Sequence, residues 1–140
     1  MITKKAEYAI IILAELAGHP AGSKMTSKEI AEKRSIPVNL VVQLLTLLRE
    51  AGWTRGTRGP SGGIKLVGDP ENIDLRQVIE LVDGPLGITR CLFSERPCRD
   101  KTHCSLRGVW VKAQEKMLEV LENVTIADLS RASMQDLECK

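Results

Sequence analysis

Residues 26–67 have the sequence TSKEIAEKRSIPVNLVVQLLTLLREAGWTRGTRGPSGGIKLV, which predicts two short helices followed by a β-hairpin. The first helix should begin at residues 26–29, because Thr-x-x-Glu is the pattern of a capping box. It should end near Arg34, since the following Ser-Ile-Pro interrupts it and the proline suits the first turn of a second helix. That second helix should run to about Ala51 and stop at Gly52.

Residues 53–67 complete this module as strand, turn and strand. The predicted strands are 53–55 and 64–67, and the glycines in 56–63 permit the positive backbone dihedrals of a tight hairpin tip. Two helices joined by a tight turn and followed by a hairpin predict a winged helix-turn-helix. In that arrangement the second helix enters the major groove of DNA, and the hairpin is the wing.

Polar residues share one face of the second predicted helix. Asn39, Gln43 and Thr46 are spaced i, i+4 and i+7, so they could reach base edges, although a solvated polar face is the alternative. The wing favours DNA, because basic side chains around a narrow hairpin tip can neutralise phosphates or enter the minor groove. The predicted DNA-binding residues are Thr26, Ser27, Lys28, Asn39, Gln43, Thr46, Arg49, Arg55, Arg58, Gly59 and Lys65.

Charge is divided unevenly along the chain. The formal net charge is +2, but residues 1–68 carry +5 and residues 69–140 carry −3. This division agrees with a nucleic-acid surface in the first half, although an excess of this size is also common on solvated faces.

The remaining sequence is also mostly helical. Residues 3–18 favour a helix, which Gly-His-Pro at 18–20 terminates. Asp74 and Gln77 predict the N-terminal cap of another helix, and Thr125 can cap a last short helix. We therefore predict a mainly α fold with a small β-hairpin wing. Its predicted parts are a winged helix-turn-helix domain over 1–84, a cysteine-containing loop over 85–104, and a dimerisation helix with a C-terminal tail over 105–140.

A heptad pattern follows the cysteines. Six apolar residues are spaced 4, 3, 4, 3 and 4 positions apart, as in a helix that packs against another helix. They are Leu106, Trp110, Ala113, Met117, Val120 and Val124. A domain this small offers little other surface to cover the stripe. We therefore predict a two-fold homodimer interface, and packing against the first helix of the same chain is the alternative.

Three cysteines lie within fourteen residues, as Cys91-x6-Cys98-x5-Cys104. An odd number of clustered thiols favours a metal or redox site over a structural disulfide. Zinc held with His103 is one alternative, although the close Cys-x2-Cys pairs usual in structural zinc sites are missing. A clusterless thiol sensor is another. Cys139 stands next to the last residue and is not expected to be a ligand.

Other classes of protein fit poorly. The only histidines are His19 and His103, and no catalytic motif accompanies them, so an enzyme is not predicted. A scaffold that only dimerises would leave the arginines of the wing unexplained. No apolar run approaches the roughly 20 residues that span a bilayer, and no convincing signal-peptide cleavage site follows the first apolar run. We therefore expect a cytoplasmic protein, in which thiols stay reduced.

Several segments of the chain resemble one known family. They are LLREAG at 47–52, RGPSGG at 58–63 and VIELVDG at 78–84, together with the three cysteines. They are similar in order and spacing to the IscR/NsrR-type winged-helix regulators, the Rrf-two family, over nearly the whole chain. The resemblance implies a homodimeric bacterial transcription factor that binds pseudo-palindromic operator DNA, for example as a repressor. It also implies that the cysteine loop can hold an iron-sulfur cluster.

Within this resemblance, Cys91, Cys98 and Cys104 would anchor the cluster and leave one position for a weaker ligand. IscR-like members have a histidine three residues after the last cysteine, where this chain has Arg107, which cannot serve. NsrR-like members have a carboxylate before an aromatic residue in the first helix, and here Glu7 precedes Tyr8. Glu7 from the partner subunit is thus the first choice for the fourth ligand. The alternative is that Glu7 is a solvated helix residue that binds no metal.

His103 is the second choice for this ligand. The carboxylate next to Tyr8 favours a [4Fe-4S] over a [2Fe-2S] cluster. Assembly, oxidation or loss of the cluster is expected to change operator affinity by altering the relative placement of the two winged modules.

Overall fold

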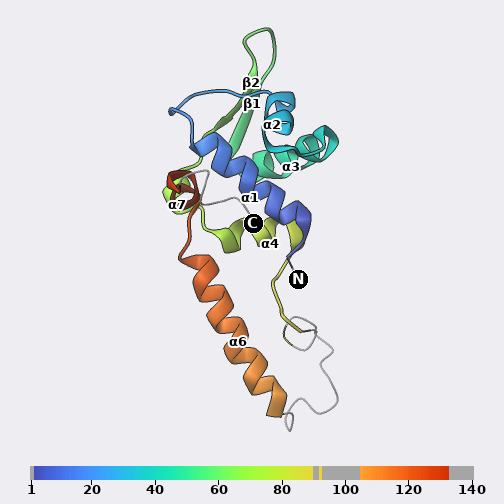
Figure 1. The fold of residues 1–140 in the computed structure, drawn as a ribbon, viewed down its shortest axis with the longest axis vertical. Helices are drawn as coiled ribbons and strands as arrows, with labels where there is room; N and C mark the ends of the chain where they lie inside the picture. The colour runs from blue at the N-terminus through green and yellow to red at the C-terminus, as the bar shows by residue number, and fades with distance from the viewer. Residues whose placement is uncertain (1, 90–91, 93–104, 133–140) are drawn as a thin grey trace.

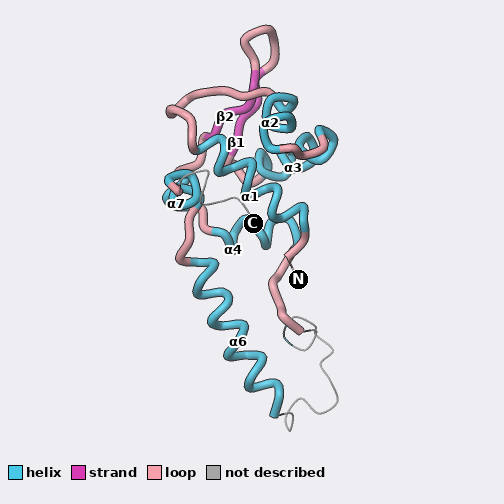
Figure 2. The backbone as a smooth tube through the Cα atoms, viewed as in Figure 1, coloured by secondary structure: helices cyan, strands magenta, loops and turns pink. Residues whose placement is uncertain are grey.

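The computed structural model describes residues 2–89, 92 and 105–132. The chain is mainly helical with one two-stranded antiparallel hairpin, which confirms the predicted fold class (Figures 1 and 2). Its elements are α1 (Lys4–Ala17), α2 (Ser27–Arg34), α3 (Val38–Glu50), β1 (Thr54–Thr57), β2 (Gly63–Leu66), the 3-10 helix η1 (Pro70–Asn72), α4 (Leu75–Asp83), α6 (Ser105–Glu122) and α7 (Ile126–Arg131).

The main core lies between α1 and the helices around it. Ile12 and Leu13 of α1 are fully buried, because apolar residues recur along this helix at the spacing of one broad face. The buried side chains that join them come from helices α2, α3, α4 and α7 and from the turns before α2, α3 and α4: Met25, Ile30, Ile36, Val41, Leu44, Leu48, Ile73, Val78 and Ile126. One continuous core thus holds the helix-turn-helix against α1.

The ends of α2 and α3 refine two predictions. A capping box has two hydrogen bonds, from the Glu29 N–H to the Thr26 hydroxyl and from the Thr26 N–H to the Glu29 carboxylate. The first is present at 3.1 Å, but the carboxylate instead accepts from the Thr26 hydroxyl, also at 3.1 Å. Pro37 precedes α3 as its N-cap instead of standing in the first turn, because its ψ of 130° is not helical. Ser35, with φ of 54°, makes the turn between the helices in the left-handed region.

The hairpin is longer than predicted. Thr54 pairs with Leu66 and Thr57 with Gly63, so β1 extends two residues into the segment expected to be the tip, and β2 begins one residue earlier. Glycine tolerates an extended conformation as well as a turn, so composition alone placed this boundary wrongly. Met25 adds a further bridge, because its N–H and carbonyl both bond to Ile64, at 2.9 and 2.7 Å.

The second half of the chain returns to the main body at one junction. The predicted caps are present: Asp74 forms a capping box at the start of α4, and Thr125 forms one at the start of α7. These two residues also form an isolated antiparallel bridge, in which the Leu75 N–H bonds to the Val124 carbonyl at 3.0 Å. Ile126 of α7 is consequently part of the main core, although it lies far beyond residue 84 in the sequence.

α6 projects from the end of the molecule opposite the hairpin (Figure 1). Its C-terminal half packs on the main body, where Met117, Leu118 and Leu121 contact a small cluster of Ala6, Ile79 and Leu86. Its N-terminal half carries exposed apolar side chains. No helix among the described residues is long and apolar enough to cross a membrane.

The predicted heptad stripe is therefore only partly available to a partner. Leu106, Trp110, Ala113 and Val120 are exposed, and Val109, which the heptad spacing omitted, is exposed beside them. Met117 is half-buried against the same chain, which is the alternative that the sequence left open. Val124 lies outside the helix, because α6 ends at Glu122.

Candidate nucleic-acid interface

The N-terminus of α2, the outer face of α3 and the hairpin meet in one surface, which we call the α3–wing surface. It contains two adjoining shallow grooves. The first is lined by Ser27, Val42, Leu45, Thr46, Arg49, Thr54, Gly56 and Ile64. The second is lined by Thr26, Ser27, Arg49, Gly56, Thr57, Arg58, Gly59, Gly62, Gly63 and Ile64. Six predicted DNA-binding residues are thus brought together from three elements: Thr26, Ser27, Thr46, Arg49, Arg58 and Gly59.

The outer face of α3 carries the predicted base-reading residues. Asn39, Gln43 and Thr46 are exposed on it, opposite the buried Val41, Leu44 and Leu48. The Thr46 hydroxyl donates to the Val42 carbonyl at 3.1 Å, so this hydroxyl hydrogen is already used within the helix.

Two valines on this face were not among the predicted site residues. Val38 and Val42 are exposed, one helical turn apart, beside Asn39 and Thr46. The helical period already leaves both valines outside the apolar face of Val41, Leu44, Leu45 and Leu48, and the structure shows them exposed.

Of the five predicted cations, Arg49 and Arg58 line the grooves, whereas Lys28, Arg55 and Lys65 do not. Arg55 and Lys65 pair with each other between the groove-lining Thr54 and Gly56, so they face the other side of the hairpin. Lys28, Arg49, Arg55 and Arg58 are exposed, and Lys65 is half-buried on β2. Within residues 2–89 and 105–132, no carboxylate lies within 4.0 Å of these five cations, in contrast to Arg76 and Arg131, which bond to glutamates elsewhere. Their charge is therefore available to phosphates rather than neutralised within the described residues.

Backbone geometry fixes the wing relative to α2. The Met25–Ile64 bridge attaches β2 to the residue just before the N-cap of α2. At the tip, Gly59 has φ of 101°, and a Cβ built on Gly62 would lie 2.3 Å from the Thr57 carbonyl oxygen. The tip therefore requires glycine at both positions for its shape.

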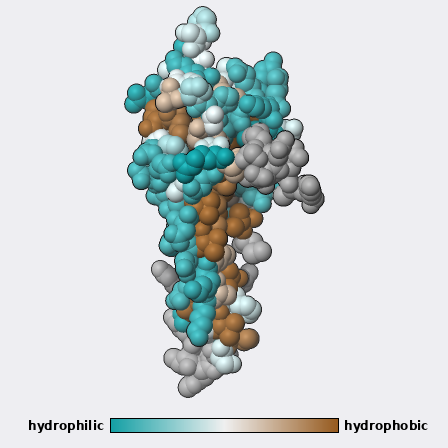
Figure 3. Space-filling view, turned by 60° about the vertical axis from the view of Figure 1, so that its left-hand side comes forward, coloured by the Kyte–Doolittle hydropathy of each residue, from teal (hydrophilic) through white to brown (hydrophobic). Residues whose placement is uncertain are grey.

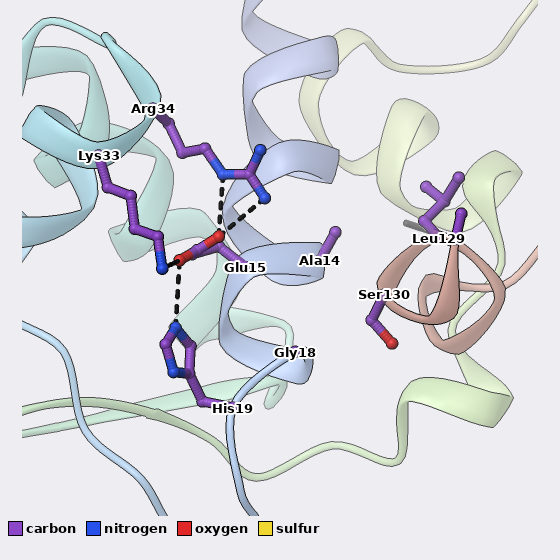
Figure 4. A pocket seen from close by; sticks show the side chains of 9 residues that line it. Ala14, Glu15, Gly18, His19, Lys33, Arg34, Leu129 and Ser130 are labelled. Atoms are coloured by element: carbon purple, nitrogen blue, oxygen red, sulfur yellow. Dashed lines mark hydrogen bonds and ion pairs between the residues drawn. The ribbon is translucent and has the colours of Figure 1, made fainter. Parts of the chain in front are cut away.

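A buried carboxylate fixes α2 relative to α1. Glu15 is only 4% exposed, and its two oxygens accept from Lys33 at 2.6 Å, from Arg34 at 2.7 and 2.9 Å, and from the His19 ring at 3.1 Å (Figure 4). Burial by itself raises the pKa of Glu15, but the hydrogen bonds from Lys33 and His19 and the charges of Arg34 and Lys33 outweigh it and lower the pKa below 4.5. The helix-turn-helix is thus joined to α1 by a charged cluster as well as by the apolar core.

A small cavity of about 270 Å³ lies beside this cluster. Figure 4 shows Ala14 of α1, and Gly18 just after this helix, between the charged side chains and Leu129 and Ser130 of α7. One signal for this cluster is present in the sequence: Glu15 is spaced i+3 from Ile12, on the apolar side of α1, where a carboxylate needs cationic partners.

The proposed metal ligands lie mostly outside the described residues. This applies to Cys91, Cys98, Cys104 and His103. Cys139, which is not expected to be a ligand, also lies outside the described residues. Glu7 is described: it stands in the first turn of α1, its side chain is 51% exposed, and it pairs with Lys4 at 3.2 Å. Within residues 2–89, 92 and 105–132, no three His, Cys, Asp or Glu side chains are grouped to hold a metal ion.

The start of α1 is attached to the start of the cysteine segment. The Thr3 N–H bonds to the Asp83 carboxylate at 2.9 Å, and Asp83 is the last residue of α4. Glu7 therefore lies one turn from the point where the chain leaves α4 toward Cys91.

Comparison with known proteins agrees with this arrangement. The profile of the Rrf2 family, described as iron-dependent transcriptional regulators, matches residues 2–132. The HTH-type transcriptional regulator IscR of Vibrio vulnificus is 30% identical over 128 residues, which cover 91% of this chain and 76% of that protein.

Solved structures share the fold. CymR, the global cysteine regulator of B. subtilis, is 28% identical, with a TM-score of 0.78 over 93% of this chain and 95% of that chain. IscR of T. potens, at 24% identity, supports the fold alone, with a TM-score of 0.77 over 100% of this chain and 93% of that chain. The protein described here therefore belongs to the Rrf2 family and is a transcriptional regulator, not an enzyme.

Proposed function

We propose that the protein binds pseudo-palindromic operator DNA as a homodimer, and that an iron-sulfur cluster held by Cys91, Cys98 and Cys104 sets its affinity. The observation that carries the DNA-binding part is the α3–wing surface. There, exposed polar side chains of α3 adjoin Arg49 and Arg58, which line the grooves, and Lys28, Arg55 and Lys65 lie on α2 and the hairpin. None of these five cations has a carboxylate within 4.0 Å among the described residues. Polar side chains on a helix can reach base edges, and unpaired cations neutralise phosphates.

The homodimer is supported by the exposed apolar residues of α6. Leu106 and Val120 are 56% and 63% exposed, and Val109 and Trp110 lie on the same side of the helix. Figure 3 shows a band of apolar atoms running down the projecting part of the molecule. A second copy would cover this stripe and present two α3 helices to DNA, which is why a two-fold related operator is expected.

The cluster is supported by the three thiols and by the matching family profile, which is described as iron-dependent transcriptional regulators. Three thiolates bind iron firmly and leave one position for a weaker ligand, for which Glu7 of the partner subunit is proposed first and His103 second. The accessible carboxylate of Glu7, close to the end of α4, fits this role. When bound, the cluster supplies a labile coordination position at which a signal can act. A [4Fe-4S] form is preferred to a [2Fe-2S] form because of this carboxylate.

Protein purified without oxygen tests the cluster directly. We expect visible absorption and a Mössbauer spectrum of an iron-sulfur cluster, and loss of both when Cys91, Cys98 or Cys104 is replaced by serine. Cys139→Ser is the matched control and should keep the cluster. A colourless protein that contains zinc, or neither metal, would instead favour the zinc-dependent or clusterless thiol regulator.

The switch is tested by gel shifts of apo and reconstituted protein on the same promoter fragment. A change from mostly free to mostly bound requires a difference of about 5 kcal/mol in binding free energy between the two states. Equal affinity of apo and cluster-loaded protein would refute the switch and leave DNA binding itself intact.

The wing is tested by the dependence of affinity on salt. The triple variant Arg55→Gln, Arg58→Gln and Lys65→Gln should bind more weakly on every DNA sequence. The slope of log affinity against log salt should fall by about 0.9 for each lost phosphate contact. Lys112→Gln, an exposed lysine on α6, is the control and should leave the slope unchanged. An unchanged slope in the triple variant would show that the hairpin does not contact the DNA backbone.

A further inference from the structure

The exposed face of α3 has an unusual composition for a helix surface. From Val38 to Leu48 it carries no charged residue, and its exposed side chains are Val38, Asn39, Val42, Gln43 and Thr46. The first charge of the helix is Arg49, at the edge of both grooves of the α3–wing surface.

The two valines are explained neither by packing nor by helix propensity. Val38 is 46% exposed and Val42 is 51% exposed, so neither fills the core. Valine also favours a helix less than alanine, glutamate or lysine do, because its branched side chain loses rotamer freedom against the preceding turn. A solvent-facing position of a helix is therefore a poor place for valine unless the side chain has a partner.

The partner is limited by the neighbours of the valines. Asn39 and Gln43 can each form two hydrogen bonds with the major-groove edge of adenine, and guanine is usually read by arginine or lysine. Thymine presents a methyl group in the same groove, which apolar side chains contact. Since the Thr46 hydroxyl donates to the Val42 carbonyl, that side chain has no hydroxyl hydrogen left for a base.

We infer that α3 reads A·T base pairs: Asn39 and Gln43 bind adenine edges, and Val38 and Val42 contact thymine methyl groups. Thr46 adds its own methyl group to the apolar stripe. This inference rests on the proposed function, because it assigns the bases that the α3–wing surface would recognise. It specifies the ligand as a half-site rich in A·T pairs, with any guanine contact left to Arg49 at the end of the helix.

The inference is tested first by selection of binding sites from a pool of random duplexes, with full-length protein at one fixed salt concentration. The expected result is a pair of half-sites with A·T pairs at the central contacted positions. Selected sites with G·C pairs at these positions would overturn the inference while showing that the protein binds specific DNA. Failure to bind any duplex would overturn both the inference and the proposed function.

The second test removes single methyl groups from the selected site. Replacing one contacted thymine by uracil should weaken binding of the wild-type protein about fourfold, the size expected for burying one methyl group. Val38→Ala and Val42→Ala should each lose this preference at one position. Val67→Ala is the matched control, since Val67 is 44% exposed at the far end of the hairpin, and it should keep both preferences.

Adenine contacts have a corresponding probe. Replacing a contacted adenine by 7-deazaadenine removes one acceptor from its major-groove edge, and this should weaken wild-type binding about tenfold. Asn39→Ala and Gln43→Ala should each bind the substituted and the unmodified duplex equally well when the substitution is at the adenine that the lost side chain contacts. The inference would be refuted if neither the uracil nor the 7-deazaadenine substitution changed the affinity for a duplex that still binds in a salt-dependent manner. The proposed function would then still stand.

Discussion

Replacement of Glu15 by glutamine should lower the free energy of unfolding by about 2 to 3 kcal/mol. The substitution keeps the size of the side chain but removes the negative charge that Lys33 and Arg34 share. Breaking a buried ion pair costs more than losing a surface pair, because the remaining charges are left uncompensated. The expected loss of unfolding free energy is smaller than for a fully buried ion pair, since the Lys33 side chain is 47% exposed and can still be hydrated. Urea unfolding followed by circular dichroism measures it.

Glu7→Gln is the matched control, on the same helix. Its carboxylate is half-exposed and pairs with one lysine, so the same substitution should change stability by less than about 1 kcal/mol. A loss for Glu15→Gln no larger than that for Glu7→Gln would mean that the cluster does not stabilise the fold.

The pH dependence of stability has a definite sign. Because the pKa of Glu15 is lowered in the folded state, its contribution is complete above the ordinary value of 4.5 and is lost as the pH falls below it. The wild-type protein should therefore lose its advantage over Glu15→Gln in acid, and the two unfolding curves should converge. A difference that stays constant from neutral pH into acid would contradict this assignment.

The double variant Leu106→Glu and Trp110→Glu should convert the dimer to a monomer. In a two-fold interface each substitution occurs twice, so four carboxylates would have to be buried or left facing one another. We expect the dimer dissociation constant to rise at least about 1000-fold, which corresponds to roughly 4 kcal/mol. Sedimentation equilibrium measures the mass, and operator affinity should fall with it, because one winged module alone contacts only one half-site.

Lys112→Glu is the control for this experiment. It adds a carboxylate to the same helix, at an exposed residue outside the apolar stripe, and should leave the mass unchanged. If the double variant sediments as the wild type does, α6 is not the dimer interface. If the wild type is itself a monomer, the homodimer is wrong.

Local signals in the sequence predicted most of the elements. The caps at Asp74 and Thr125, and the glycine after α3, involve residues within four positions of one another, so their hydrogen bonds follow from the chain itself. The helix-turn-helix and hairpin follow from the same short-range rules. The exposure of Asn39, Gln43 and Thr46 follows because the helical period places them opposite a strongly apolar face.

Contacts between distant residues could not be predicted in the same way. Met25 lies 39 positions from Ile64, and no pattern in either segment selects the other as a partner. The division of α6 depends on where Ala6, Ile79 and Leu86 come together, which heptad spacing does not report.

The shape of the hairpin tip bears on how mutations in this protein would be interpreted. In a saturating genetic screen for lost regulation, every substitution of Gly62 would score as severely as the loss of a phosphate contact. The cause would be a collision of the new Cβ with the Thr57 and Gly59 carbonyl oxygens, at 2.3 and 2.9 Å, and not a missing interaction with DNA. Genetic intolerance in the wing thus divides into positions that hold the loop closed and positions that contact phosphates, and only the loss of the second kind directly removes a salt-dependent contact with DNA.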